Sequence, residues 1–89
     1  MFQNYPFTTG QVSVGASATL IVAANHDRSG LVITNLGTTD VYIGLAGVTT
    51  STGHLLPGTK GASVAFSTTL AVYGITGGGE QSVSYLQTQ

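Results

Sequence analysis

The feature that most constrains the fold is an alternation of apolar and polar side chains with a period of two. Residues 11–15, QVSVG, alternate strictly, and β-branched runs follow at 18–24 and 30–35. Successive side chains of an extended strand point to opposite faces, so this pattern predicts strands. No segment of ten or more residues keeps an apolar stripe at helical spacing, so we expect no helix. The predicted strands are residues 11–15, 18–24, 30–35, 40–44, 62–67, 70–76 and 81–87.

The length of the chain limits how these strands can be arranged. With 89 residues, two independent cores would leave each half too small to offset its chain entropy, so we expect one domain. Short, closely spaced strands are typical of sandwiches and barrels. We therefore predict an all-β fold, a single small β-sandwich or jelly-roll-like barrel of about seven to eight antiparallel strands. The domain spans residues 11–89 and follows an N-terminal arm of residues 1–10; an eighth strand at 54–56 would close a jelly roll.

The same alternation predicts which side chains point into the core. In a two-layer sandwich, the inward positions of each strand are two residues apart, and a register error of one residue would exchange the faces. The expected inward residues are Leu20, Val22, Leu31, Ile33, Val41, Ile43, Val64, Phe66, Leu70, Val72, Val83 and Tyr85.

Charge is unusually scarce. Charged residues make up 6% of the chain, against roughly 25% in ordinary soluble domains. With a net charge of −1 and only Arg28 and Lys60 as strong cations, the chain cannot neutralise several phosphates, which argues against nucleic acid as a partner. No apolar window approaches the length of a membrane-spanning helix, so we expect neither an export signal nor a membrane span. Asp27 beside Arg28 predicts a weak surface ion pair.

Few side chains could perform chemistry. The acids Asp27, Asp40 and Glu80 lie in predicted turns rather than at converging strand positions. His26 and His54 are far apart and lack metal-binding spacing, and no nucleophile elbow is present. The chain also has no cysteine. We therefore expect that the protein is not an enzyme and has no catalytic residues, no metal and no cofactor.

Apolar residues also occupy positions out of phase with the expected core. Val32 is out of phase with Leu31 and Ile33, and Ile21 is out of phase with Leu20 and Val22. Tyr73 and Ile75 are out of phase with Val72. One sheet face is therefore too apolar to meet water alone, and contiguous exposed apolar surface marks interaction sites. We expect a homo-oligomer or a larger host surface to cover it.

Two segments are candidates for partner contacts. The arm contains Phe2, Tyr5 and Phe7, which either cap the domain's own sandwich or reach a neighbouring subunit or partner surface. The loop from 44 to 61 is rich in Gly, Thr and Ser and contains Leu55 and Leu56. It either lies flat against another protein or is an ordinary surface loop, and we expect both leucines to be buried against the domain or a neighbour.

The order of these segments resembles a known family. ATLIVAANHDRSGLVITNLGTTDVYIG at 18–44, VTTSTGHLLPG at 48–58, VYGIT and VSYL resemble small all-β domains in virion proteins of tailed bacteriophages, over about residues 11 to 87. Such domains occur in head decoration or cement proteins and in head or tail fibre accessories. The resemblance implies a structural virion protein, with trimers favoured, that binds the major capsid protein and stabilises the capsid from its outer surface.

The same resemblance implies a location on the virion, preceded by the host cytoplasm during assembly, without enzymatic activity or cofactor. The alternative within the family is a fibre module that binds a receptor or glycan. Tyr42, Tyr73 and Tyr85 near strand ends could stack on sugars, although core or interface packing is the favoured interpretation.

Overall fold

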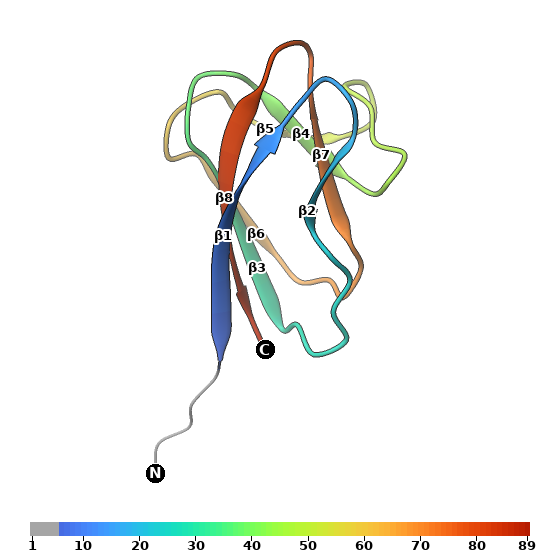
Figure 1. Cartoon of the computed structure of the whole chain (residues 1–89), viewed down its shortest axis with the longest axis vertical. Coiled ribbons are helices and arrows are strands. Elements are labelled where there is room, and N and C mark those ends of the chain that lie inside the picture. Colours follow the sequence, from blue (N-terminus) through green and yellow to red (C-terminus); the bar gives the residue numbers. More distant parts are fainter. Residues whose placement is uncertain (1–5) are drawn as a thin grey trace.

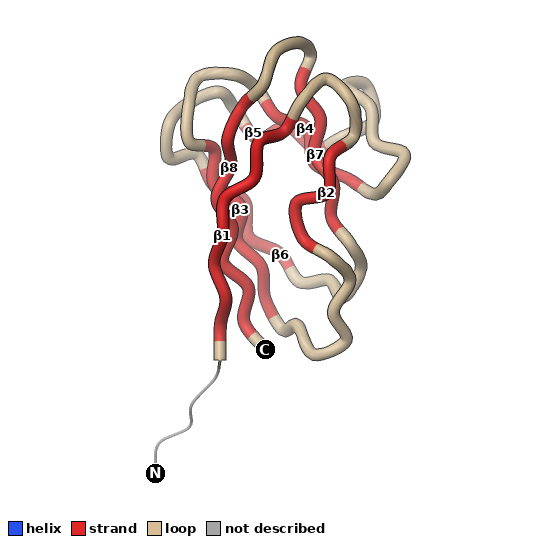
Figure 2. Tube along the Cα trace, in the orientation of Figure 1, coloured by secondary structure: helices blue, strands red, loops and turns tan. Residues whose placement is uncertain are grey.

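Eight β-strands form within residues 6–89, the part of the chain that the computed structural model describes (Figure 1). These residues contain no helix (Figure 2), as the sequence predicts. The strands are β1 (Phe7–Val14), β2 (Thr19–Val22), β3 (Gly30–Asn35), β4 (Val41–Gly44), β5 (His54–Leu56), β6 (Ser63–Phe66), β7 (Val72–Thr76) and β8 (Gln81–Thr88).

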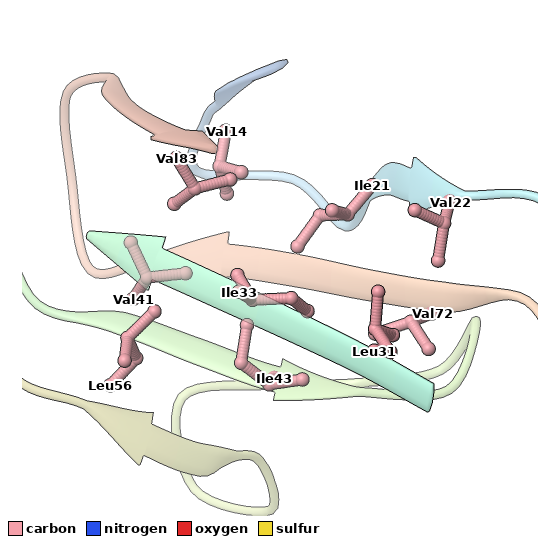
Figure 3. Close-up of a cluster of buried hydrophobic side chains, with 10 residues drawn as sticks. All are labelled: Val14, Ile21, Val22, Leu31, Ile33, Val41, Ile43, Leu56, Val72 and Val83. Atoms are coloured by element: carbon pink, nitrogen blue, oxygen red, sulfur yellow. The ribbon is translucent and has the colours of Figure 1, made fainter. Parts of the chain in front are cut away.

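The strands form two four-stranded sheets. The first sheet has the order β1-β8-β3-β6 and the second the order β2-β7-β4-β5, and within residues 6–89 the neighbouring strands of each sheet are antiparallel. Buried side chains from both sheets meet between them, as Figure 3 shows for Ile33 on β3 and Ile43 on β4. The prediction of a small all-β sandwich is confirmed.

Each predicted strand overlaps an observed one, but β1 begins at Phe7, four residues before the expected start at Gln11. Residues 7–10 of the expected arm therefore belong to a strand. The reason is pairing: β1 and β8 are in register from Phe7 opposite Thr88 to Val14 opposite Gln81. The segment 7–10 has little apolar alternation of its own, so its partner strand, and not its pattern, makes it extended. The strand at 54–56 is present as β5.

The core prediction is largely confirmed. Seven of the twelve expected residues are buried, and Val64, Phe66 and Tyr85 are half-buried against the core. The predictions for Leu20 and Leu70 are wrong, because both side chains are exposed. The buried hydrophobic residues are Val14, Ile21, Val22, Leu31, Ile33, Val41, Ile43, Val48, Leu56, Val72 and Val83.

A β-bulge explains the error at Leu20. Leu20 is opposite Tyr73 and Val22 is opposite Val72, so Ile21 is an extra residue on β2. A bulge breaks the two-residue alternation, and here Ile21 and Val22 are both buried while Leu20 faces outward. The expectation that Ile21 lies out of phase with the core is therefore also wrong. A strict period of two could not predict this.

A buried arginine joins the elements at one end of the sandwich. The Arg28 side chain is only 4% exposed. It donates hydrogen bonds from Nε to Gln87 Oε1 at 2.8 Å, from Nη1 to the carbonyls of Thr68 and Leu70, and from Nη2 to the carbonyl of Ala23. The prediction of a surface ion pair with Asp27 is wrong, because the guanidinium points inward, where these carbonyl groups accept its hydrogen bonds.

A buried asparagine has the same role at the other end of β3. Asn35 is fully buried, and its Nδ2 donates to the carbonyl oxygens of Thr39 at 2.8 Å and Pro57 at 3.0 Å. Its Oδ1 accepts from the backbone N–H of Gly37 at 2.9 Å. The loops that enter and leave the β4–β5 hairpin are therefore fastened to β3. Buried polar groups satisfied in this way specify one arrangement of the loops.

Candidate functional site

The outer surface of the second sheet carries five large apolar side chains, which we call the apolar face. They come from four neighbouring strands and alternate with residues that point into the core, so they project away from the first sheet. The register places Leu20 opposite Tyr73, and Tyr42 opposite both Ile75 and Leu55. The members of the apolar face are Leu20, Tyr42, Leu55, Tyr73 and Ile75.

The apolar face is accessible and uncharged. Leu20 is 43% and Leu55 is 46% exposed, while Tyr42, Tyr73 and Ile75 are half-buried. Directly opposed side chains on antiparallel strands lie about 5 Å apart at Cβ, so these residues form one contiguous surface. Tyrosine combines a large apolar area with a hydroxyl group that can hydrogen-bond, and it is enriched at protein interfaces.

The loop after β4 packs against the border of this face. Val48 is buried, and a Cβ added to Gly44 would lie 2.8 Å from Val48 Cγ2. A Cβ on Gly53 would lie 2.7 Å from the Cβ of Tyr42. The two glycines therefore let the loop lie directly on β4, which holds Tyr42 in place and makes the uncharged loop an ordered part of the surface.

Hydroxyl groups satisfy the backbone of this loop. Thr49 Oγ1 accepts hydrogen bonds from the N–H groups of Ser51 and Thr52, both at 3.2 Å. Thr52 Oγ1 accepts from the N–H of Thr49 at 3.1 Å. The repeated Thr and Ser residues therefore form turns through their side chains, which explains how the loop is ordered without charge.

The two leucines predicted as partner contacts have opposite positions. Leu55 lies on the apolar face, whereas Leu56 is 1% exposed and belongs to the domain's own core. Adjacent residues of a strand point to opposite faces, so only one of the pair can face a partner. Leu56 is therefore buried against the domain, one of the two expected alternatives, and is a core residue and not an accessible partner contact. The contact of the exposed Leu55 with a partner stays a prediction.

The predicted aromatic contacts of the arm are only partly within the described structure. Phe7 is on β1 in the first sheet and is 61% exposed, so it is not part of the apolar face. Phe2 and Tyr5 lie outside the described residues 6–89. Of the tyrosines considered for sugar stacking, Tyr42 and Tyr73 share the apolar face, while Tyr85 lies over Gly10 and packs against the core.

The three acidic side chains lie at the surface of the described part of the chain. Asp27, Asp40 and Glu80 are all exposed, and Asp40 Oδ1 accepts a hydrogen bond from the N–H of Gly58 at 2.6 Å. Among residues 6–89, no three His, Asp or Glu side chains come together in a group that could hold a metal ion. No helix of these residues is long and apolar enough to cross a membrane.

No family model, curated protein or solved structure matches the chain. The apolar face is therefore characterised from its own residues. The sequence pattern predicts that Tyr73 and Ile75 lie out of phase with the core. It does not predict this for Leu20, which the bulge turns outward. The separation of Leu55 from Leu56 follows from the pairing of β5 with β4, which the short segment HLL does not reveal by its pattern.

Proposed function

We propose that this domain is a structural docking module and that its apolar face binds the surface of a larger protein assembly. The observation that carries the proposal is the register of the second sheet, which aligns Leu20 with Tyr73 and aligns Tyr42 with Ile75 and Leu55. Contiguous exposed apolar residues of this kind mark protein interaction sites. Burying them against a partner removes apolar surface from water without burying a charge.

The assembly we propose is the capsid of a tailed bacteriophage, with the domain as a decoration or cement protein on its outer surface. The resemblance of segments 18–44 and 48–58 to such virion domains supports this choice, as does the 6% content of charged residues. Charged residues are depleted in the cores of protein interfaces. The partner is then the major capsid protein, and the domain acts as a homo-oligomer, with trimers favoured, that stabilises the shell without catalysis.

A second candidate is a fibre accessory module that binds a glycan. Tyr42 and Tyr73 support it, because they lie on adjacent strands of one face: Tyr73 is opposite Gly44, two residues after Tyr42. Aromatic side chains at diagonal positions are about 7–8 Å apart between Cα atoms, close enough to form one platform. The leucines beside them favour protein over sugar, because sugars need several polar side chains for recognition.

Co-sedimentation tests the proposal. Capsid shells that lack the protein are mixed with the purified chain, and we expect saturable binding with a fixed number of copies per shell and a higher shell melting temperature. Failure to bind any shell, together with saturable retention on a glycan array, would instead support the fibre module. Binding to shells that persists after substitution of the apolar face would show that another surface is responsible.

A further inference from the structure

An apolar cleft of about 380 Å³ opens between the two sheets beside the edge strands β5 and β6. Its walls include Ile43 and Leu45 from β4 and the following loop, Val64 and Phe66 from β6, and Val72 from β7. His54 contributes the only titratable side chain of the lining. Val64 and Phe66 point inward but are half-buried, so the core remains accessible at this side.

We propose that this cleft receives the aromatic side chains of residues 2–5 from a second copy of the chain. The inference rests on the homo-oligomer of the proposed function and deepens it, because it assigns the contact between copies to a surface other than the apolar face. Residues 2–5 lie outside the described structure, and their sequence is Phe-Gln-Asn-Tyr.

The chemistry of the segment fits the cleft. Phe2 and Tyr5 supply two rings and no charge. The cleft is lined mostly by aliphatic residues and Phe66, and its polar side chains, His54 and Thr68, include no carboxylate or strong cation. Aromatic rings bury large apolar areas, and a buried tyrosine hydroxyl normally finds a hydrogen-bond partner. His54 at the cleft offers such a partner for Tyr5.

The position of β1 makes the donor a second copy. Phe7 is on β1 at one edge of the first sheet, and β6 is the opposite edge, three strand spacings away. Three spacings amount to about 14 Å. Tyr5 is two residues before Phe7, and two extended residues reach only about 7 Å. Tyr5 therefore cannot enter the cleft of its own domain. Phe2 is five residues before Phe7 and could span about 17 Å, so the two rings can enter one cleft together only from a second copy.

A contact of this kind is heterologous, because a segment at one edge of a copy meets a cleft at the other edge of the next. Heterologous contacts generate closed rings when the rotation between copies closes. The contact therefore provides a route to the expected trimer that leaves the apolar face free for the shell.

Disulfide trapping tests the contact directly, because the chain contains no cysteine. A Gln3→Cys variant is mixed with a Leu45→Cys variant, which places one thiol between the two aromatic residues and the other at the cleft. The control pairs Gln3→Cys with Leu86→Cys, since Leu86 is exposed on the outer face of the first sheet. We expect a mixed disulfide with Leu45→Cys only. Equal trapping with both variants, or none with either, would overturn the proposal.

Light scattering gives a second measurement that does not depend on any shell. We expect the full chain to self-associate, and deletion of residues 2–5 to leave a folded monomer. Leu45→Glu places a carboxylate at the cleft and raises the dissociation constant by about tenfold or more, the effect of losing a strong interface residue. Leu86→Glu leaves the dissociation constant of self-association within about twofold of that of the unchanged chain. A monomeric full chain at millimolar concentration, or an oligomer that survives the deletion, contradicts the inference.

The two proposals fail separately. Leu20→Glu alters the apolar face and should weaken shell binding while self-association is unchanged; deletion of residues 2–5 should abolish self-association in the absence of shells. Circular dichroism of each variant verifies the fold.

NMR of the deletion variant provides a further test. Titration with a peptide of residues 1–6 should shift the methyl signals of Ile43 and Val64 but not those of Val32, and an absence of shifts counts against the contact.

Discussion

Arg28 donates a hydrogen bond from Nε to Oε1 of Gln87 at 2.8 Å, which connects the loop between β2 and β3 to the end of β8. The same guanidinium binds the carbonyls of Thr68 and Leu70 in the β6–β7 loop. One side chain thus satisfies three acceptors that are each 40 or more residues away from it in the sequence. Only arginine carries enough donors in a planar arrangement to do so.

Arg28→Lys should therefore destabilise the domain although the charge is kept. The ammonium group cannot reach the same acceptors, and each buried carbonyl left without a donor costs about 1–3 kcal/mol. We expect the free energy of unfolding to fall by about 2–4 kcal/mol in urea denaturation. Lys60→Ala at an exposed position is the control and should change it by less than about 0.5 kcal/mol. Equal effects of the two substitutions would contradict the role of Arg28.

Asn35→Asp tests the polar group at the opposite end of β3. The change replaces the amide that donates to Thr39 and Pro57 with an oxygen, so two buried carbonyls would face a carboxylate. We expect a loss of about 3 kcal/mol or more at neutral pH. The loss should shrink as the pH falls, because protonation removes the charge and restores one donor. Asn25→Asp is the matched control, since Asn25 accepts a hydrogen bond through Oδ1 from the N–H of Asp27.

Gly10→Ala should disturb the aromatic side chain that lies over β1. A Cβ at Gly10 would come within 2.6 Å of the Tyr85 hydroxyl oxygen and 2.7 Å of its Cζ. Displacing a packed ring costs about 1–3 kcal/mol. Gly15→Ala is the control, because a Cβ there meets nothing within 4 Å. Thermal unfolding should separate the two variants, and a melting temperature for Gly10→Ala equal to that of the unchanged protein would show that Tyr85 moves away freely.

Leu20→Glu should separate binding from folding on the apolar face. Leu20 is exposed on β2 opposite Tyr73, so a carboxylate there remains in water in the free domain and leaves stability within about 1 kcal/mol. Against a shell, the same carboxylate would be buried without a partner, which weakens binding by about tenfold or more. Leu86→Glu on the first sheet should bind as the unchanged protein does. Co-sedimentation at several concentrations measures the dissociation constants of the two variants for the shell.

The sequence alone determined the class of fold and much of the core. Alternation with a period of two predicts strands because a pleated backbone turns successive side chains to opposite faces. Leu31, Ile33, Val41 and Ile43 follow that alternation and are buried as predicted. The scarcity of charge is also visible in the composition alone. It indicates, without any structure, a surface that another protein can cover.

Only the tertiary structure decided which apolar residues remain outside. Leu20 faces outward because a bulge at Ile21 shifts β2 against β7, and Leu55 separates from Leu56 because β5 pairs with β4. Arg28 is buried because carbonyls from distant segments converge on it. Each outcome depends on a partner that is far away in the chain. Local patterns record the preferences of a segment but not the register of the strand beside it.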